Sequence, residues 1–138
     1  MMTDTKPKGV VLTPGRMKAY ERGGGARTIP LVGPRIGAKS FLNGMTLFSP
    51  GAAIPLHTHN CEESVLLLEG NAIAEIDGER HAITAGDISW IPEGVPHRFI
   101  NASDTEGMKI LWTYARVDAT RTLVGTGDTR PVLAEHED

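Results

Sequence analysis

The sequence predicts an all-β fold in a single domain. The chain has 138 residues, which is enough for one hydrophobic core and short for two. Its 16 glycines and 9 prolines favour tight turns over long helices. From residue 40 onward, short β-prone segments alternate with Gly, Pro, Asn or Asp, a spacing typical of an antiparallel barrel or sandwich.

Three parts are predicted along the chain: a flexible basic N-terminal arm over residues 1–27, a barrel over residues 28–118 and a polar C-terminal tail over residues 119–138. The arm is interrupted by prolines and ends at the glycine run of residues 23–25, as linkers often do. Residues 28–32 are β-prone but lie next to prolines. Because proline has no N–H for a central strand, this segment is expected at a sheet edge.

Within the barrel, the first long strand is expected at residues 40–49, where Ser49-Pro50-Gly51 signals a turn. Asp77-Gly78 predicts a two-residue hairpin between its neighbouring strands, because glycine accepts the positive φ that this turn needs. The other strands are predicted at residues 53–59, 64–69, 71–76, 80–84, 88–91, 97–101 and 108–117.

Charge is unevenly distributed along the chain. Residues 1–39 contain eight Lys/Arg and two Asp/Glu, a net charge of +6, against −9 for the remaining residues. No aromatic or recognition-helix pattern accompanies the basic segment, so nucleic acid is not predicted as a partner. The pattern favours a homodimer in which the arm, or the strand at residues 28–32, crosses to the acidic barrel of a second copy.

Cys61 is the only cysteine, so no intrachain disulfide can form and an oxidising compartment has no support. The first 14 residues lack the apolar run of a signal peptide, and no segment has the apolar length of a membrane span. We therefore expect a soluble cytoplasmic protein with no membrane partner.

Four side chains stand out as candidates for metal binding. His57 and His59 occupy alternate positions of a predicted strand, so both imidazoles lie on the same face. Glu63 has the same parity and leads into the next strand, while its neighbour Glu62 points outward and is interpreted as a surface carboxylate. His97 begins another strand that could lie opposite.

These residues fall into two spaced motifs. The first has the form G-x5-H-x-H-x3/4-E-x6-G, and the sequence fills it with Gly51, His57, His59, Glu63 and Gly70. Every defined position of this motif is therefore present.

The second motif has the form G-x5-P-x-G-x2-H-x3-N, filled by Gly86, Pro92, Gly94, His97 and Asn101. Together the two motifs resemble those of the cupin family, and the 15 residues between them resemble the spacing of small single-domain cupins. The resemblance implies a cupin-type antiparallel β-barrel of the jelly-roll-like, double-stranded kind. No ligand role for Asn101 can be argued.

The resemblance also implies that His57, His59, Glu63 and His97 hold one divalent metal ion per subunit. Three imidazoles and a carboxylate, without a thiolate, suit Fe, Mn, Zn, Ni or Co. Four protein ligands on an octahedral ion leave positions for water or substrate. The formal charge of such a site is +1, which favours an anionic, chelating substrate.

Three further residues are candidates for the substrate pocket, each with packing as the alternative. Cys61 shares the inward parity of the ligands, although a small buried filler is the more common role of a free cysteine. Phe99 follows His97 on the same face, and Trp112 shares a face with Tyr114. Aromatic residues on such strands are more often core than substrate platform.

The leading functional prediction is a metal-dependent enzyme that acts on a small polar organic substrate, with an Fe(II) or Mn(II) dioxygenase placed first. Glu63 would be a metal ligand that can also accept a proton. One alternative is an isomerase or lyase acting on a sugar or oxo-acid, in which the metal serves as a Lewis acid. A non-catalytic barrel that binds a small ligand is the other.

Overall fold

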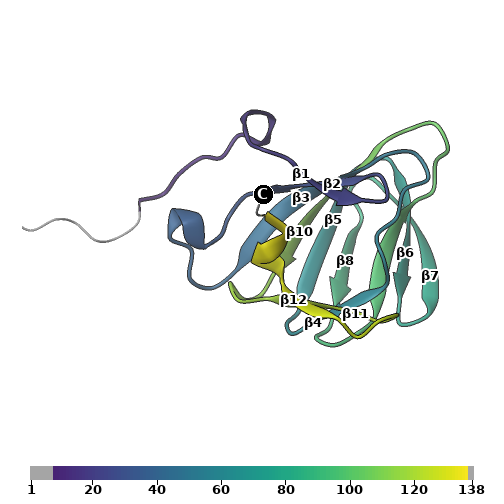
Figure 1. The fold of residues 1–138 in the computed structure, drawn as a ribbon. Coiled ribbons are helices and arrows are strands. Elements are labelled where there is room, and N and C mark those ends of the chain that lie inside the picture. Colours follow the sequence, from purple (N-terminus) through teal and green to yellow (C-terminus); the bar gives the residue numbers. More distant parts are fainter. Residues whose placement is uncertain (1–7, 137–138) are drawn as a thin grey trace, which may run out of the picture.

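Two six-stranded antiparallel sheets form the molecule in the computed structural model, which describes residues 8–136 (Figure 1). One sheet has the order β1 (Tyr20–Gly23), β2 (Ala26–Pro30), β3 (Leu42–Phe48), β10 (Met108–Tyr114), β5 (Glu63–Glu69) and β8 (Ile88–Ile91). The other has the order β12 (Thr129–Pro131), β11 (Thr120–Leu123), β4 (His57–His59), β9 (His97–Asn101), β6 (Asn71–Ile76) and β7 (Glu79–Thr84). The prediction of an all-β fold built from antiparallel strands is confirmed.

The helices are short 3-10 turns: η1 (Pro14–Arg16), η2 (Pro34–Ile36) and η3 (Val132–His136). Among the described residues, no helix has the length and apolar character needed to span a bilayer.

Alternating side chains place the core between the two sheets. Along β10, every second side chain from Met108 to Tyr114 is buried, while those between are only partly covered. On the facing sheet, β9 buries His97, Phe99 and Asn101 in the same alternation. The inside of the barrel therefore combines an apolar core with a row of buried polar groups.

The predicted hairpin is present. Strands β6 and β7 pair from Asn71↔Thr84 to Ile76↔Glu79, and Asp77 and Gly78 between them have φ values of 51° and 81°. Positive φ at both central residues is the geometry of the turn that Asp-Gly favours, because its twist matches that of the paired strands.

The prediction that residues 28–32 form an edge strand is wrong. Strand β2 pairs with β3 on one side and with β1 on the other, so β1 is the edge of this sheet. The glycine run of residues 23–25 causes the difference. All three glycines have positive φ, and they reverse the chain into a hairpin where a linker was expected.

Strand pairing also extends past residue 118. Strand β11 pairs with β4 in a register that joins Arg121 to His59, and β12 continues the sheet outward. Figure 1 shows the C-terminal segment, in yellow, crossing from β12 toward β1, where η3 contacts β1 and β2. Residues 1–7 of the predicted arm and residues 137–138 of the predicted tail lie outside the described residues.

Strand β4 is shorter than the predicted strand at residues 53–59 and begins only at His57. Pro55 explains the late start, because it has no N–H to donate to a neighbouring strand. Ahead of it, Ala53 forms a single isolated bridge with Ile100.

Candidate metal centre

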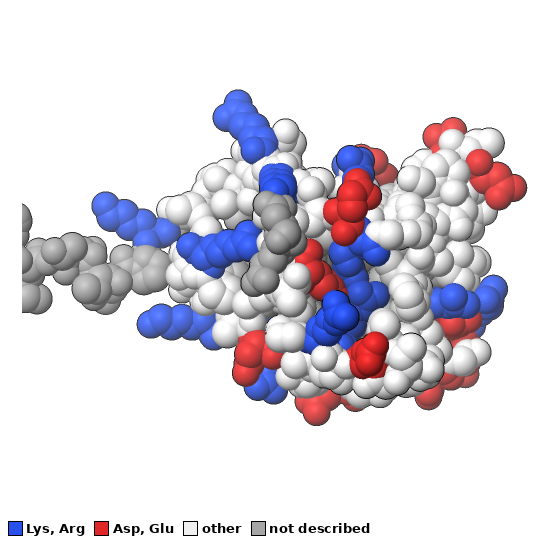
Figure 2. Space-filling view, in the orientation of Figure 1, with Lys and Arg blue, Asp and Glu red and all other residues white. Residues whose placement is uncertain are grey.

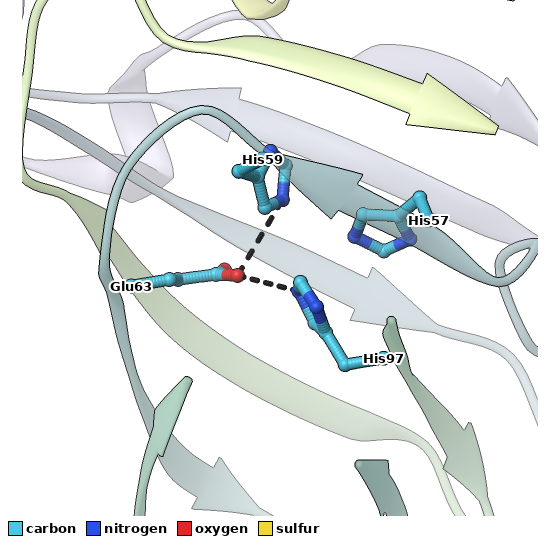
Figure 3. A group of neighbouring side chains, drawn as sticks. All are labelled: His57, His59, Glu63 and His97. Carbon is cyan, nitrogen blue, oxygen red and sulfur yellow. Dashed lines mark hydrogen bonds and ion pairs between the residues drawn. The ribbon is translucent and has the colours of Figure 1, made fainter. Parts of the chain in front are cut away.

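The four predicted metal ligands lie together inside the barrel (Figure 3). His57 and His59 come from β4, Glu63 from the start of β5, and His97 from β9, where it is the cross-strand partner of His57. All four are buried, and their ligand atoms lie within 4.8 Å of one another. Residues from two parts of the sequence thus point at a single volume.

Backbone carbonyl groups orient the three imidazoles. Each ring places its Nδ1 against a carbonyl oxygen: that of Pro55 for His57 at 2.7 Å, that of Thr120 for His59 at 2.8 Å, and that of Val95 for His97 at 2.9 Å. An Nδ1–H that donates to a carbonyl leaves the lone pair of a neutral ring on Nε2. This is the arrangement in which protein histidines bind metal ions.

Glu63 faces the Nε2 atoms of two of these rings (Figure 3). Its Oε1 lies 2.7 Å from Nε2 of His97 and 3.5 Å from Nε2 of His59. The Nε2 atom of His59 is buried and has no hydrogen-bond partner within residues 8–136. An orphaned ring nitrogen beside a buried carboxylate is what a divalent cation would satisfy, so the residues present fit such an ion.

The environment keeps two of the rings neutral. Burial, together with repulsion from His97 and His59, holds the pKa of His57 well below its usual value. Burial also lowers the pKa of His59, against the attraction of Glu63. For His97, burial favours the neutral ring, but the hydrogen bond and charge of Glu63 outweigh it and raise the pKa. Neutral imidazoles are the form that binds metal.

Aromatic side chains enclose the centre from β10. The ring of Tyr114 lies 4.4 Å from that of His59 and stacks on Trp112 with centroids 4.9 Å apart. Trp112 donates its indole N–H to Oγ1 of Thr46 at 2.8 Å. The cavity beside the ligands leaves about 20 Å³ of free space, which is room for a water or an ion.

The three predicted pocket residues separate into two groups. Phe99 and Trp112 line this cavity, but Cys61 is not among the described residues that do. Cys61 is instead packed in the apolar core, and burial raises the pKa of its thiol. Glu62 is exposed, as predicted, and accepts a hydrogen bond from the indole of Trp90 at 2.9 Å.

Sequence reasoning missed an ion-pair group at one side of the cavity. Arg22 from β1 and Arg121 from β11 both line the cavity, and both contact Glu135 of η3, at 3.1 Å and 3.0 Å. The parts of the chain that supply them were predicted to be arm and tail. Arg121 could not be predicted from the inward-facing position of His59. The two residues pair across strands that lie about 60 residues apart in the sequence.

The comparisons with known proteins agree with this geometry. The family described as "Cupin domain" matches residues 44–114, which is about half of the chain and holds all four candidate ligands. The polyketide synthase CurC from Streptomyces cyaneus is 35% identical over 91 residues, or 65% of this chain and 58% of CurC. Quercetin 2,3-dioxygenase from Bacillus subtilis is 42% identical over 50 residues, or 36% of this chain and 15% of that enzyme.

Solved structures of similar fold have lower sequence identity. The polyketide cyclase RemF from Streptomyces resistomycificus has a TM-score of 0.72 at 22% identity, covering 91% of this chain and 86% of RemF. A sugar phosphate isomerase of the cupin superfamily from Silicibacter pomeroyi has a TM-score of 0.69 at 20% identity, covering 89% and 93%. Family match, motifs and barrel coincide, and the chain belongs to the cupin family.

Proposed function

We propose that the protein is a metal-dependent enzyme that holds one divalent ion and acts on a small polar organic substrate. One observation carries this proposal: three ring nitrogens and a carboxylate converge on one buried point, while each Nδ1 is already committed to a backbone carbonyl. Histidines that only pack in a core would not need all three Nδ1 atoms to be held by backbone carbonyls in the same way. The bound ion, which by its ligands would be Fe, Mn, Zn, Ni or Co, would supply a positive centre for an oxygen-rich substrate.

The chain's own residues would share the remaining tasks. His57, His59 and His97 would bind the ion as neutral rings, and Glu63 would bind it as an anion. Glu63 keeps a second carboxylate oxygen when the first binds the ion, so it is also the candidate for a catalytic proton acceptor. Phe99 and Trp112 would exclude water from one side of the site.

Dioxygenation is the leading reaction. Its support is the 42% identity to quercetin 2,3-dioxygenase, which is confined to 50 residues. The test begins with metal analysis of protein prepared without added metal. Oxygen uptake is then measured with an electrode against small diketones, thiols and aromatic diols. Uptake by the wild type but not by His59→Ala supports the proposal; His81→Ala, which changes an exposed histidine away from the site, is the matched control.

Reaction without oxygen is the second candidate. The polyketide cyclase RemF and the sugar phosphate isomerase favour it, because their matches cover more of both chains than the match to the dioxygenase does. Here the ion would act only as a Lewis acid, in cyclisation, isomerisation or lyase chemistry on a polyketone, sugar or oxo-acid. Turnover under anaerobic conditions with Zn or Ni would support this reading and exclude dioxygenation. Tight ligand binding without turnover in either experiment would instead indicate a non-catalytic binding barrel.

We also propose that the protein is a cytoplasmic homodimer. The outer face of the first sheet exposes Ile88 (69%) and Trp90 (63%) on β8, with Leu68 (37%) on the adjacent β5. Neighbouring exposed apolar side chains of this size favour burial against a partner. Light scattering after size exclusion should give a mass of twice the 14.8 kDa chain, and Trp90→Glu should shift it to that of the monomer.

A further inference from the structure

We infer that Arg121 forms a binding site for a carboxylate, or a planar oxyanion of like shape, at the edge of the candidate metal centre. As a statement about substrate, this inference rests on the proposed function. The anion site itself is argued from Arg121 and its surroundings alone.

The guanidinium of Arg121 is only partly used. Its Nη1 contacts Oε1 of Glu135 at 3.0 Å, while its Nε and Nη2 are buried and have no hydrogen-bond partner within the described part of the chain. Leaving buried donors of a charged group unpaired is unfavourable, because they lose their contact with water and gain no partner. If Arg121 only anchored η3 to the barrel, one contact would be enough and the free donors would remain unexplained.

The free donors form a particular edge of the guanidinium. Nε and Nη2 point in the same direction and match the two oxygens of a carboxylate. Arg116 uses this edge elsewhere in the chain, where its Nε and Nη2 contact Oδ1 and Oδ2 of Asp118. In Arg121 the same edge is empty, so a carboxylate from outside the chain would complete it.

Arg121 also stands between two spaces. It lines the small cavity that holds His57, Glu63 and His97. It also lines an outer pocket of about 300 Å³, together with Leu123, Asp128, Arg130 and Glu135. This volume is at the lower end of ligand pockets, whereas the inner cavity is too small for an organic molecule. A substrate in the outer pocket could therefore contact Arg121 beside the metal ligands.

The charges favour an anion at this place. Arg22 and Arg121 share the single carboxylate of Glu135, so the group has a net charge of +1. A divalent ion held by Glu63 would add a further +1. Figure 2 shows Lys and Arg side chains gathered at the centre of one face, with Asp and Glu beside them. Glu135 should oppose an incoming anion, because it reduces the positive potential of Arg121.

Malonate is the probe, and uncharged malonamide of similar shape is the control. Both are titrated calorimetrically into metal-free and zinc-loaded full-length protein, with zinc content measured separately. We expect the metal-free wild type to bind malonate and not malonamide. Arg121→Gln should weaken binding by about tenfold or more, because it removes both the positive charge and the pair of parallel donors. Arg121→Lys keeps the positive charge but lacks the parallel Nε and Nη2 donors, so it should also weaken malonate binding.

Two further variants make the result decisive. Glu135→Gln should strengthen malonate binding, which a merely structural ion pair would not do. Arg80→Gln, which removes an exposed cation on β7 that lines neither space, should change the affinity by less than about twofold. If Arg121→Gln does not fold, Arg121→Lys and Glu135→Gln decide. The inference is overturned if malonate affinity is insensitive to Arg121, or if Arg80→Gln has the same effect.

The two proposals can fail separately. Malonate binding that depends on Arg121 in a chain that takes up none of Fe, Mn, Zn, Ni and Co would leave the anion site standing and remove the metal-dependent enzyme. Zinc uptake without dependence on Arg121 would do the reverse.

Discussion

Two buried polar regions in the same barrel differ in how completely their hydrogen bonds are made. At one end, the amide nitrogen of Asn101 contacts the carbonyl oxygens of Phe48, Ser49 and Glu106 at 3.3, 3.1 and 2.9 Å, and its oxygen accepts from the backbone of Ser103 at 3.0 Å. At the other end, Nε2 of His59 has no partner among the described residues.

The two regions come from the same pair of motifs, so motif membership does not separate them. Asn101 is saturated by backbone groups and ties the end of β9 to the end of β3 and the following loop. The histidines use backbone carbonyls only to fix Nδ1, which leaves Nε2 of His59 without a partner among the described residues and Nε2 of His97 facing Glu63. A saturated buried group contributes stability, whereas an open one is held for a ligand.

The largest expected effect is the loss of metal from His59→Ala. Removing one of three imidazoles should reduce bound metal from about one equivalent to less than about a tenth, because the remaining ligands no longer enclose the ion. The barrel should stay folded but be less stable. Metal content is measured by mass spectrometry after dialysis, and a full equivalent in this variant would show that the ligand assignment is wrong.

Asn101→Ala should have the opposite profile. We expect the free energy of unfolding to fall by about 3 kcal/mol, because several buried carbonyl groups lose their donor. Metal binding should survive, so saturating zinc should still raise the melting temperature of this variant. Denaturant titration measures the loss, and the exposed Asn71→Ala is the control. A stable variant that has lost its metal would reverse the assignment of the two regions.

His136 tests the open region by pH, because its ring stacks on Trp112, which lines the cavity beside the metal ligands. Burial, with the charges of Arg22 and Arg35, lowers its pKa from 6.5 to about 4. Between those values the unfolded chain binds the proton more readily than the folded one, so the stability of the folded state falls as pH falls through this window. In metal-free protein, His136→Gln should flatten the decline between about pH 6.5 and 4. If the melting temperature of the variant fell with pH as steeply as that of the wild type, a group other than His136 would be responsible for the decline.

Cys61→Ala should have the smallest effect. The thiol is packed among apolar side chains and does not line the cavity, so its removal should cost about 1 kcal/mol of stability. Metal content and malonate affinity should be unchanged. A change in metal content or in malonate affinity would show that Cys61 belongs to the site, as its inward position along the strand predicts.

Much of this arrangement can be predicted from short-range patterns. Asp77-Gly78 specifies its hairpin through backbone preference alone, and the parity of His57, His59 and Glu63 within neighbouring segments brings their side chains together. Predicting that His97 joins them also required the second motif, because His97 belongs to a strand that is distant in the sequence.

The edges of the sheets were harder to predict. Strand β11 is half-buried at every position, so it has no inward and outward alternation to detect. Arg121 reaches the site only because β11 pairs with β4, and Glu135 only because η3 crosses to β1. Such long-range contacts have no local signature, and for this reason the ion-pair group was missed while the four motif residues were not.

Anomalous diffraction from crystals grown with zinc tests the central claim most directly. We predict a single peak per chain, about 2.0–2.2 Å from Nε2 of His57, His59 and His97 and from a carboxylate oxygen of Glu63. A peak elsewhere on the chain, or these four side chains in place with no ion among them at saturating zinc, would contradict the account.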